Sequence, residues 1–378
     1  MRQRWDIFCR VIDNFGDIGV CWRLAKQLAH ERGLQVRLYV DDLNVAKQLI
    51  PKLDVAQQIQ LVEHVSIQHW QTEMVFGNAV DVVIAAFACE LPQAYLANKQ
   101  SSTVWVNLEY LSAEPWVETS HLLPSPNAQF ALIKELGLIK HFYFPGFTQN
   151  TGGLLREHGL IARRQVFQQS ESAQREFWQQ LGVIADDSLK ISLFCYAYAP
   201  LQALFYALAG GIENTTLLVP FNKHIQKLAS FFGKKSLNIG DKVSVGQLTL
   251  QVLPFLSQDD YDMLLWACDI NFVRGEDSWV RAIWAGKPFV WQPYWQSENT
   301  HITKLNAFLQ VFYADCDNAT KQVIVEAYSA WVAGDITYQI WQHYLDNLPA
   351  IKTVTKHQSD QLAAQVDLAA KLVIFCNA

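Results

Sequence analysis

The sequence alternates short apolar runs with segments of helical spacing along most of its length. Residues 80–88 and 103–108 are continuous runs rich in Val and Ile, as expected of parallel strands buried on both faces. Further strands are expected at residues 5–11, 35–40, 190–195, 216–221, 248–255, 270–273 and 289–292. Strands that alternate with helices predict α/β sheets with helices packed on both faces.

Helical patterns lie between these strands. Val20, Leu24 and Leu28 recur at helical spacing until Gly33, which predicts the end of a helix there. Ser257 can cap a helix through Leu265, whose first turn carries acidic residues. Other helices are expected at residues 201–209, 225–232, 278–285 and 358–375.

The chain length favours two domains. The 378 residues exceed the ~100 to 200 residues usual for one domain, and the strand pattern degrades between about residues 146 and 188. We therefore expect Rossmann-like domains at residues 1–160 and 161–357, with residues 358–378 as a helix packing back across them. Two domains that share a cleft are the natural expectation for this length, and ligands of such sheets bind beyond the carboxyl ends of the strands.

Composition excludes several classes of protein. The net charge is −6 without a basic run, so nucleic acid is not an expected ligand. The longest apolar run, residues 82–89, is too short for a membrane span, and the first residues do not resemble a signal peptide. Seven scattered cysteines favour reduced thiols. We expect a cytoplasmic protein with no membrane or nucleic-acid partner.

One candidate site is the loop at residues 13–19, between the first strand and its helix. Gly16 and Gly19 permit tight turns, and Asp13 and Asp17 place two carboxylates at a helix N-terminus. Two acids repel a pyrophosphate and suit a cationic acceptor. From spacing alone, the alternative that Asp17 only caps the helix is about equally favoured.

A second candidate site lies at residues 274–278, after the strand at residues 270–273. Backbone N–H groups of Asp277 and Ser278 at a helix start, beside Gly275 and Arg274, can cradle a diphosphate. A capped helix with Arg274 and Glu276 on the surface is the alternative. The predicted helix ends at Gly286, followed by Lys287 and Pro288. The complete pattern of strand, turn, helix and Gly-Lys-Pro is more specific than any one of these residues.

Three blocks of sequence resemble a known family. They are residues 5–23 (WDIFCRVIDNFGDIGVCWR), 105–114 (WVNLEYLSAE) and 274–288 (RGEDSWVRAIWAGKP), and they resemble the bacterial protein-arginine rhamnosyltransferases of translation elongation factor P. The resemblance implies two facing Rossmann-like domains of the GT-B glycosyltransferase type with the active site in the interdomain cleft. It also implies dTDP-β-L-rhamnose as donor, elongation factor P as acceptor and transfer with inversion.

The resemblance also implies roles for individual residues. It implies that Asp13 and Asp17 are the acids that bind the acceptor, with Asp17 as the base. It also implies that residues 1–160 form the acceptor-binding domain and residues 161–357 the nucleotide-sugar-binding domain. The residues expected to bind the donor are Phe15, Gly16, Tyr196, Gln258, Arg274, Glu276, Asp277, Ser278 and Tyr294. Glu276 is expected to bind the donor and to have an indirect catalytic role. The residues expected to contact the protein acceptor are Glu109, Tyr110 and Glu114, and the alternative is that they form an ordinary loop without a function.

These residues suit the implied chemistry. A protonated guanidinium must lose a proton as it attacks, which a carboxylate can accept, and Arg274 can stabilise the departing diphosphate. No metal or cofactor is expected, because Asp315-Cys-Asp317 is better interpreted as a loop than as a metal-binding Asp-x-Asp motif. A sugar-nucleotide epimerase and a translation-factor-binding protein without turnover are the rival hypotheses.

Overall fold

The computed structural model describes residues 3–12, 15–71, 74–77, 80–97, 102–125, 138–222 and 225–378. Its backbone contacts divide the chain into two compact units. Unit 1 comprises Met1–His158 and Gln365–Ala378, and unit 2 comprises Gly159–Ala364. The chain therefore leaves unit 1 once and returns to it for its last helix.

The described strands of unit 1 form a seven-stranded sheet in the order β3-β4-β2-β1-β5-β6-β7. Neighbouring strands are parallel except for β3 and β4. The parallel strands follow the order 3-2-1-4-5-6, which is that of the Rossmann fold. The strands are β1 (Arg4–Cys9), β2 (Gln35–Val40), β3 (Ile59–Val62), β4 (Val65–His69), β5 (Val82–Ala86), β6 (Val104–Leu108) and β7 (Lys140–Tyr143).

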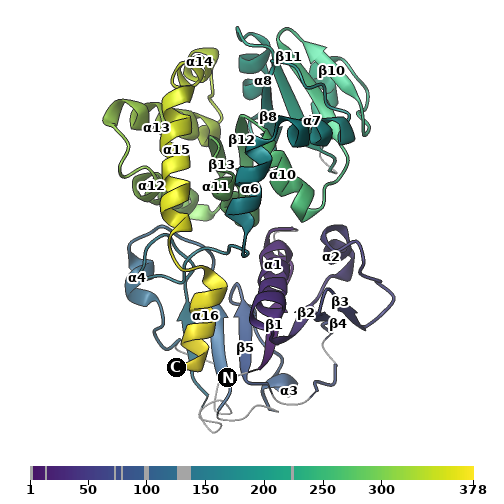
Figure 1. Cartoon of the computed structure of the whole chain (residues 1–378), viewed down its shortest axis with the longest axis vertical. Coiled ribbons are helices and arrows are strands. Elements are labelled where there is room, and N and C mark those ends of the chain that lie inside the picture. Colours follow the sequence, from purple (N-terminus) through teal and green to yellow (C-terminus); the bar gives the residue numbers. More distant parts are fainter. Residues whose placement is uncertain are drawn as a thin grey trace. The chain divides into compact units, whose positions relative to one another are not determined.

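Helices α1 and α16 lie side by side against the sheet of unit 1 (Figure 1). Leu24 and Leu28 of α1 and Leu372 of α16 belong to one core cluster with Ile7 of β1. The left-handed Gly33 (φ 64°) ends α1, as predicted. The described helices of this unit are α1 (Phe15–Arg32), α2 (Leu43–Leu49), α3 (Gln93–Leu96), α4 (Trp116–Ser120) and α16 (Leu368–Asn377).

Unit 2 has a second sheet in the order β10-β11-β9-β8-β12-β13. Only β10 is antiparallel to its neighbour, so the remaining strands follow the parallel order 3-2-1-4-5. The predicted α/β class with two Rossmann-like sheets is confirmed. The strands are β8 (Leu189–Leu193), β9 (Thr215–Pro220), β10 (Lys242–Val245), β11 (Leu248–Leu253), β12 (Ile270–Arg274) and β13 (Phe289–Gln292).

The helices of unit 2 surround this sheet (Figure 1). Ser257 caps α10 by accepting the N–H of Asp260, as predicted. The helices are α6 (Leu160–Gln169), α7 (Glu171–Gln180), α8 (Leu201–Ala209), α9 (Gln226–Ala229), η1 (Ser230–Phe232), α10 (Gln258–Ala267), α11 (Asp277–Ala285), η2 (Ser297–Asn299), α12 (Thr300–Phe312), α13 (Asn318–Ala333), α14 (Tyr338–Asp346) and α15 (Leu348–Ala363).

Two sequence predictions differ from the structure. The single helix predicted over residues 358–375 is two helices, because α15 ends at Ala363 and Asp367 caps α16 by accepting the N–H of Ala370. The helix predicted from Val20 begins at Phe15. The predicted loop at residues 315–317 is confirmed, since Asp317 caps α13 through the N–H of Thr320.

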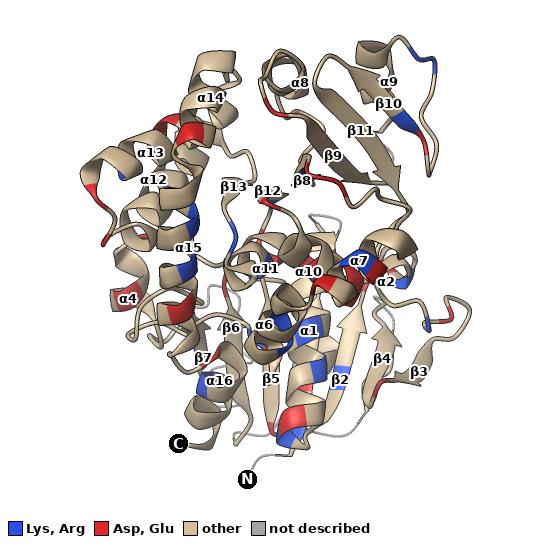
Figure 2. Cartoon of the chain, turned by 45° about the horizontal axis from the view of Figure 1, so that its top comes forward, with Lys and Arg blue, Asp and Glu red and all other residues tan. Residues whose placement is uncertain are grey.

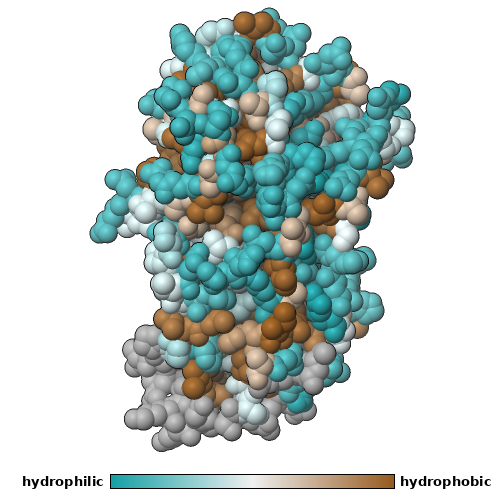
Figure 3. Space-filling view, turned by 60° about the vertical axis from the view of Figure 1, so that its left-hand side comes forward, coloured by the Kyte–Doolittle hydropathy of each residue, from teal (hydrophilic) through white to brown (hydrophobic). Residues whose placement is uncertain are grey.

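The surface carries charges of both signs. Helices α1, α7 and α15 each present acidic and basic positions (Figure 2). On the face drawn in Figure 3, hydrophobic residues form small groups among hydrophilic ones. Across the described ranges, no helix combines the length and the hydropathy needed to cross a bilayer.

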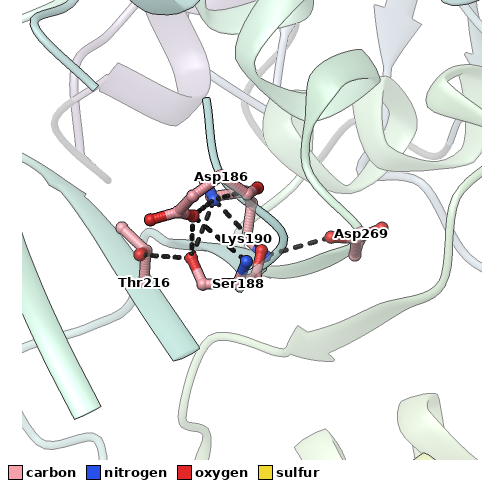
Figure 4. Close-up of polar contacts among 5 residues, drawn as sticks. All are labelled: Asp186, Ser188, Lys190, Thr216 and Asp269. Atoms are coloured by element: carbon pink, nitrogen blue, oxygen red, sulfur yellow. Dashed lines mark hydrogen bonds and ion pairs between the residues drawn. The ribbon is translucent and has the colours of Figure 1, made fainter. Parts of the chain in front are cut away.

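A polar cluster anchors β8 at the end of the sheet where the strand begins (Figure 4). The buried Lys190 Nζ donates to Asp186 Oδ1 at 2.5 Å and to Ser188 Oγ at 2.8 Å. Ser188 Oγ also lies 2.7 Å from Thr216 Oγ1 of β9, and the Lys190 N–H donates to Asp269 Oδ2 at 3.0 Å. The cluster therefore fixes β8 between its neighbours β9 and β12.

Acid should weaken this cluster in a defined pH window. The hydrogen bond from Lys190 lowers the pKa of Asp186 from 3.8 to about 2. A lowered pKa stabilises the fold above pH 3.8, and this contribution disappears as the pH falls toward 2. We expect Asp186→Asn to lower the thermal midpoint at pH 7, and the difference from wild type to shrink between pH 4 and 2. The exposed neighbour Asp187→Asn is the control, and an equal loss in both variants would contradict the assignment.

Candidate active site

Each sheet has one point at which the strand order reverses. In unit 1 this point lies between β1 and β5, which pair Phe8 with Ala85. In unit 2 it lies between β8 and β12, which pair Leu193 with Phe272. Ligands of open α/β sheets bind beyond the carboxyl ends of the strands at such points. A ligand-binding site is therefore expected at the segments that follow these four strands.

In unit 1, Asp17 lies in the first turn of α1 directly after β1. The residues from Phe15 onward are helical, so the predicted loop is shorter than expected and Gly16 and Gly19 belong to the helix. Asp17 is 2% exposed, and its Oδ2 accepts the N–H of Ile12 at 2.8 Å. A carboxylate in the first helical turn interacts favourably with the positive end of the helix dipole.

Asp17 makes side-chain contacts outside its own helix. Its carboxylate binds the Ile12 N–H, which belongs to the segment before the helix, while Oδ1 lies 3.5 Å from the Tyr110 hydroxyl. Tyr110 follows β6 and is 39% exposed. The structure thus brings two predicted acceptor-side residues together. Asp13, the other predicted acid, lies outside the described residues, and its role stays a prediction.

The remaining predicted residues of unit 1 lie at the same end of the sheet. Phe15 and Gly16 form the half-buried start of α1. Glu109 accepts a hydrogen bond from Asn107 at 2.5 Å, and Glu114 accepts one from the Ser112 hydroxyl at 3.0 Å. Glu109 and Glu114 therefore have structural bonds within their own segment, and their contact with an acceptor stays a prediction.

In unit 2, aromatic residues follow β8 at every second position. Phe194 and Tyr196 follow the end of the strand, and Tyr198 lies in the turn that the Ala199 N–H closes by donating to the carbonyl of Tyr196. The guanidinium carbon of Arg274 lies 4.6 Å from the ring centre of Phe194 and 4.5 Å from that of Tyr196. A planar guanidinium held over two rings keeps a fixed orientation without losing its charge.

Exposed aromatic residues extend this group. Tyr198 stacks on Tyr196 with ring centres 5.2 Å apart, and Tyr294 meets Tyr196 edge-on at 5.6 Å. The Tyr198 hydroxyl accepts the N–H of Trp295 at 2.9 Å, which ties the segment after β8 to the segment after β13. Sequence reasoning selected Tyr196 and Tyr294 but missed Tyr198 and Trp295. The alternation of residues 194, 196 and 198 was the available signal.

The turn from β12 into α11 is organised around Ser278. Its hydroxyl accepts the N–H of Arg274 at 3.2 Å and donates to the carbonyl oxygen of the same residue. Gly275 adopts a left-handed conformation (φ 62°), and its carbonyl accepts the Trp291 indole N–H at 2.9 Å. The Ser278 side chain therefore shapes the turn, and only its backbone N–H can serve a ligand as predicted.

The first turn of α11 presents backbone N–H groups at this edge. The first hydrogen bond within the helix runs from the N–H of Val280 to the carbonyl of Glu276, so the N–H groups before Val280 lie at the helix start. Gln258 Nε2 lies 3.4 Å from Asp277 Oδ2. Glu276 occupies the cap position, is half-buried and does not cap α11 with its side chain. The geometry suits a diphosphate next to Arg274.

A buried ion pair supports this turn from behind. Arg281 of α11 donates to Asp262 of α10 through Nε at 2.9 Å and Nη2 at 2.5 Å, and both side chains are almost fully buried. A bidentate pair of this kind fixes the two helices that carry Asp277 and Gln258. Sequence reasoning missed the pair, although Arg281 interrupts the apolar run Val280-Arg-Ala-Ile283.

The cysteine near the site is not an ionised nucleophile. Burial raises the pKa of Cys195, between Phe194 and Tyr196, to about 12, so its thiol stays protonated at neutral pH. None of the seven cysteines is paired in a disulfide in the structure. Among the residues that the structure describes, no cluster of three or more His, Cys, Asp or Glu side chains could hold a metal ion.

Fold and site together define the class of protein. The glycosyltransferase VinC, solved in complex with dTDP, aligns over 99% of this chain and 98% of its own with a TM-score of 0.51 at 11% identity. At that identity the likeness concerns the fold. Two Rossmann-like units, with an arginine and a helix start at the switch point of the second, are those of a GT-B glycosyltransferase.

Residues 5–377 match the family described as Elongation-Factor P (EF-P) rhamnosyltransferase EarP, and the chain belongs to this family of glycosyltransferases. It is 46% identical over 379 residues to the protein-arginine rhamnosyltransferase of Pseudomonas putida, covering 99% of both chains. The Pseudomonas aeruginosa enzyme of the same name is 43% identical over 375 residues, covering 98% of both. A solved structure on EarP-mediated arginine glycosylation of elongation factor P aligns with a TM-score of 0.70 and 35% identity, over 99% of this chain and 98% of the other.

Proposed function

We propose that this protein transfers L-rhamnose from dTDP-β-L-rhamnose to one arginine side chain of translation elongation factor P, with inversion at the sugar carbon. The observation that carries the proposal is the family match over residues 5–377, together with relatives named protein-arginine rhamnosyltransferases. Since the acceptor is a translation factor, we place the reaction in the cytoplasm.

The donor binds at the switch point of unit 2. Its diphosphate lies at the start of α11, where Arg274 and the backbone N–H groups of Asp277 and Ser278 neutralise its charge. Gln258, Tyr196 and Tyr294 surround the nucleotide, and Glu276 binds the donor and orients Arg274. Phe15 and Gly16, at the start of α1, also bind the donor. No metal takes part, because the arginine and the helix start supply the positive charge.

The acceptor arginine binds at the switch point of unit 1. Its guanidinium has a pKa far above neutrality and enters as a cation, which the buried Asp17 carboxylate binds. As a guanidinium nitrogen attacks, the C–N bond forms, the bond from the sugar carbon to the diphosphate oxygen breaks, and Asp17 accepts the N–H proton. The dTDP leaves with the bonding electrons. Asp13 helps to hold the guanidinium, and Glu109, Tyr110 and Glu114 contact the protein around it.

An acceptor-dependence assay tests this proposal against the two rival hypotheses. We expect release of dTDP from dTDP-rhamnose only when elongation factor P is present, with one dTDP formed per modified arginine. An epimerase would instead convert the donor without any protein acceptor. A binding protein would retain elongation factor P without forming dTDP. Either result would overturn the proposal, and chromatography of the nucleotide fraction distinguishes the three.

A further inference from the structure

Two consecutive residues after β5 adopt a backbone conformation that is unfavourable for their side chains. Phe87 and Ala88 both have φ of 56°, in the left-handed region. Such a conformation is strained for a residue that carries a Cβ, because the Cβ comes too close to the following carbonyl oxygen. They directly follow β5, which with β1 flanks the switch point of unit 1. Strained residues of this kind persist where their surroundings enforce them, and they cluster at functional sites.

The surroundings of Phe87 hold it firmly. Its N–H donates to the carbonyl of Leu108, the last residue of β6, at 2.6 Å. Its side chain is 7% exposed and belongs to the core cluster that contains Leu108 and Ile18 of α1. Phe87 is therefore fixed by both its backbone and its ring, whereas the neighbouring Ala88 is exposed.

The ring of Phe87 supports a residue of the acceptor site. It stacks against Tyr110 with ring centres 4.5 Å apart and an interplanar angle of 21°. Tyr110 in turn places its hydroxyl 3.5 Å from Asp17 Oδ1, while the Ile12 N–H holds Oδ2. Contacts thus run from the end of β5, through the end of β6, to the carboxylate that follows β1.

We propose that Phe87 is a positioning residue for the transfer reaction: its ring fixes Tyr110, and the Tyr110 hydroxyl fixes the carboxylate of Asp17 for attack by the acceptor arginine. This inference rests on the proposed function, in which Asp17 is the base. Phe87 does not touch the substrate in this account and acts only through Tyr110.

The physical reason lies in the partial exposure of Tyr110. Tyr110 is 39% exposed, and the stack on Phe87 restricts the rotamers that its ring can adopt. Without the stack, the Tyr110 hydroxyl no longer holds Oδ1 in place, and the Asp17 carboxylate can rotate about its last torsion. Proton transfer and attack require groups held close to the productive geometry, and a misplacement of about 1 Å can cost up to a hundredfold in rate.

A double-mutant cycle tests this assignment. Phe87→Leu removes the flat ring and keeps most of the bulk, whereas Tyr110→Phe keeps the stack and removes the hydroxyl. We expect Phe87→Leu to lower kcat/KM for elongation factor P by about tenfold in the wild-type background. In the Tyr110→Phe background the same change should cost less than about twofold, because the hydroxyl through which Phe87 acts is already absent.

Three controls accompany the cycle. Ala88→Gly relieves the same backbone conformation without touching the stack, and we expect wild-type kcat/KM. The affinity for dTDP, bound in unit 2, and the thermal midpoint report folding, and Phe87→Met replaces Phe87→Leu if the latter unfolds. The inference is overturned if Phe87→Leu keeps full activity, or if it costs the same factor in both backgrounds. A wild-type protein that modifies no arginine overturns the proposed function instead.

Discussion

Asp17→Asn is expected to fold, to bind dTDP normally and to lose rhamnosyl transfer by roughly 10³-fold, within the range typical for loss of a positioned base. The amide oxygen of Asn can still accept the Ile12 N–H that Asp17 Oδ2 accepts now, so the start of α1 is preserved. The amide cannot accept the proton of an attacking guanidinium, nor balance its charge. The single-turnover rate of arginine modification measures the effect.

Asp41 supplies a matched control for this substitution. Its Oδ1 accepts the N–H of Val11 at 2.9 Å, just as Asp17 accepts the N–H of the next residue, Ile12. We expect Asp41→Asn to keep the wild-type rate within a few-fold, because Asp41 holds the same segment and has no part in the proposed reaction. Equal losses in both variants would show that the segment's conformation, and not a base, limits the rate. Full activity of Asp17→Asn would remove Asp17 from the mechanism.

Arg274→Ala is expected to lower kcat/KM for the donor by about 100- to 1,000-fold, corresponding to about 3–4 kcal/mol for one well-placed charge-stabilising donor. The departing diphosphate gains charge as the sugar bond breaks, and Arg274 is held in place over Phe194 and Tyr196 to meet it. Arg274→Lys keeps the charge but loses the planar stack, so we expect it to recover only part of the activity. Steady-state kinetics with varied donor, together with calorimetric dTDP binding, separates binding from turnover.

The control for Arg274 is Arg163, an exposed arginine on α6 of the same unit. Its replacement by Ala removes the same formal charge, and we expect unchanged kinetics. The buried Arg281 is unsuitable as a control, because removing it leaves Asp262 as an uncompensated buried charge and destabilises the fold. An Arg274→Ala variant with wild-type kcat/KM for the donor would contradict the donor site described for unit 2.

The sequence predicted most strands because each is short, apolar and bounded by turn residues. It missed the antiparallel hairpin of β3 and β4, where exposed Ile59 and Leu61 on an edge strand give no clear pattern of burial. The helix start at Phe15 was also missed, because Gly16 and Gly19 favour a loop in isolation. Packing against the sheet overrides that local preference.

In the candidate site too, local features could be predicted from the sequence, whereas contacts between distant segments could not. Arg274, Gly275 and Ser278 are neighbours in sequence, so their turn could be predicted from its motif. The contacts of Tyr110 with Asp17 and of Phe87 with Tyr110 join the ends of three strands that are far apart along the chain. Only the strand order of the sheet brings these ends together, and a single sequence carries little information about that order.

The intact mass of purified elongation factor P, after incubation with this protein and dTDP-β-L-rhamnose, tests the central claim most directly. We expect a gain of one deoxyhexosyl group, located on a single arginine by fragmentation, and absent when either the donor or the enzyme is omitted. Elongation factor P of unchanged mass, in the presence of folded protein that binds dTDP, would contradict it.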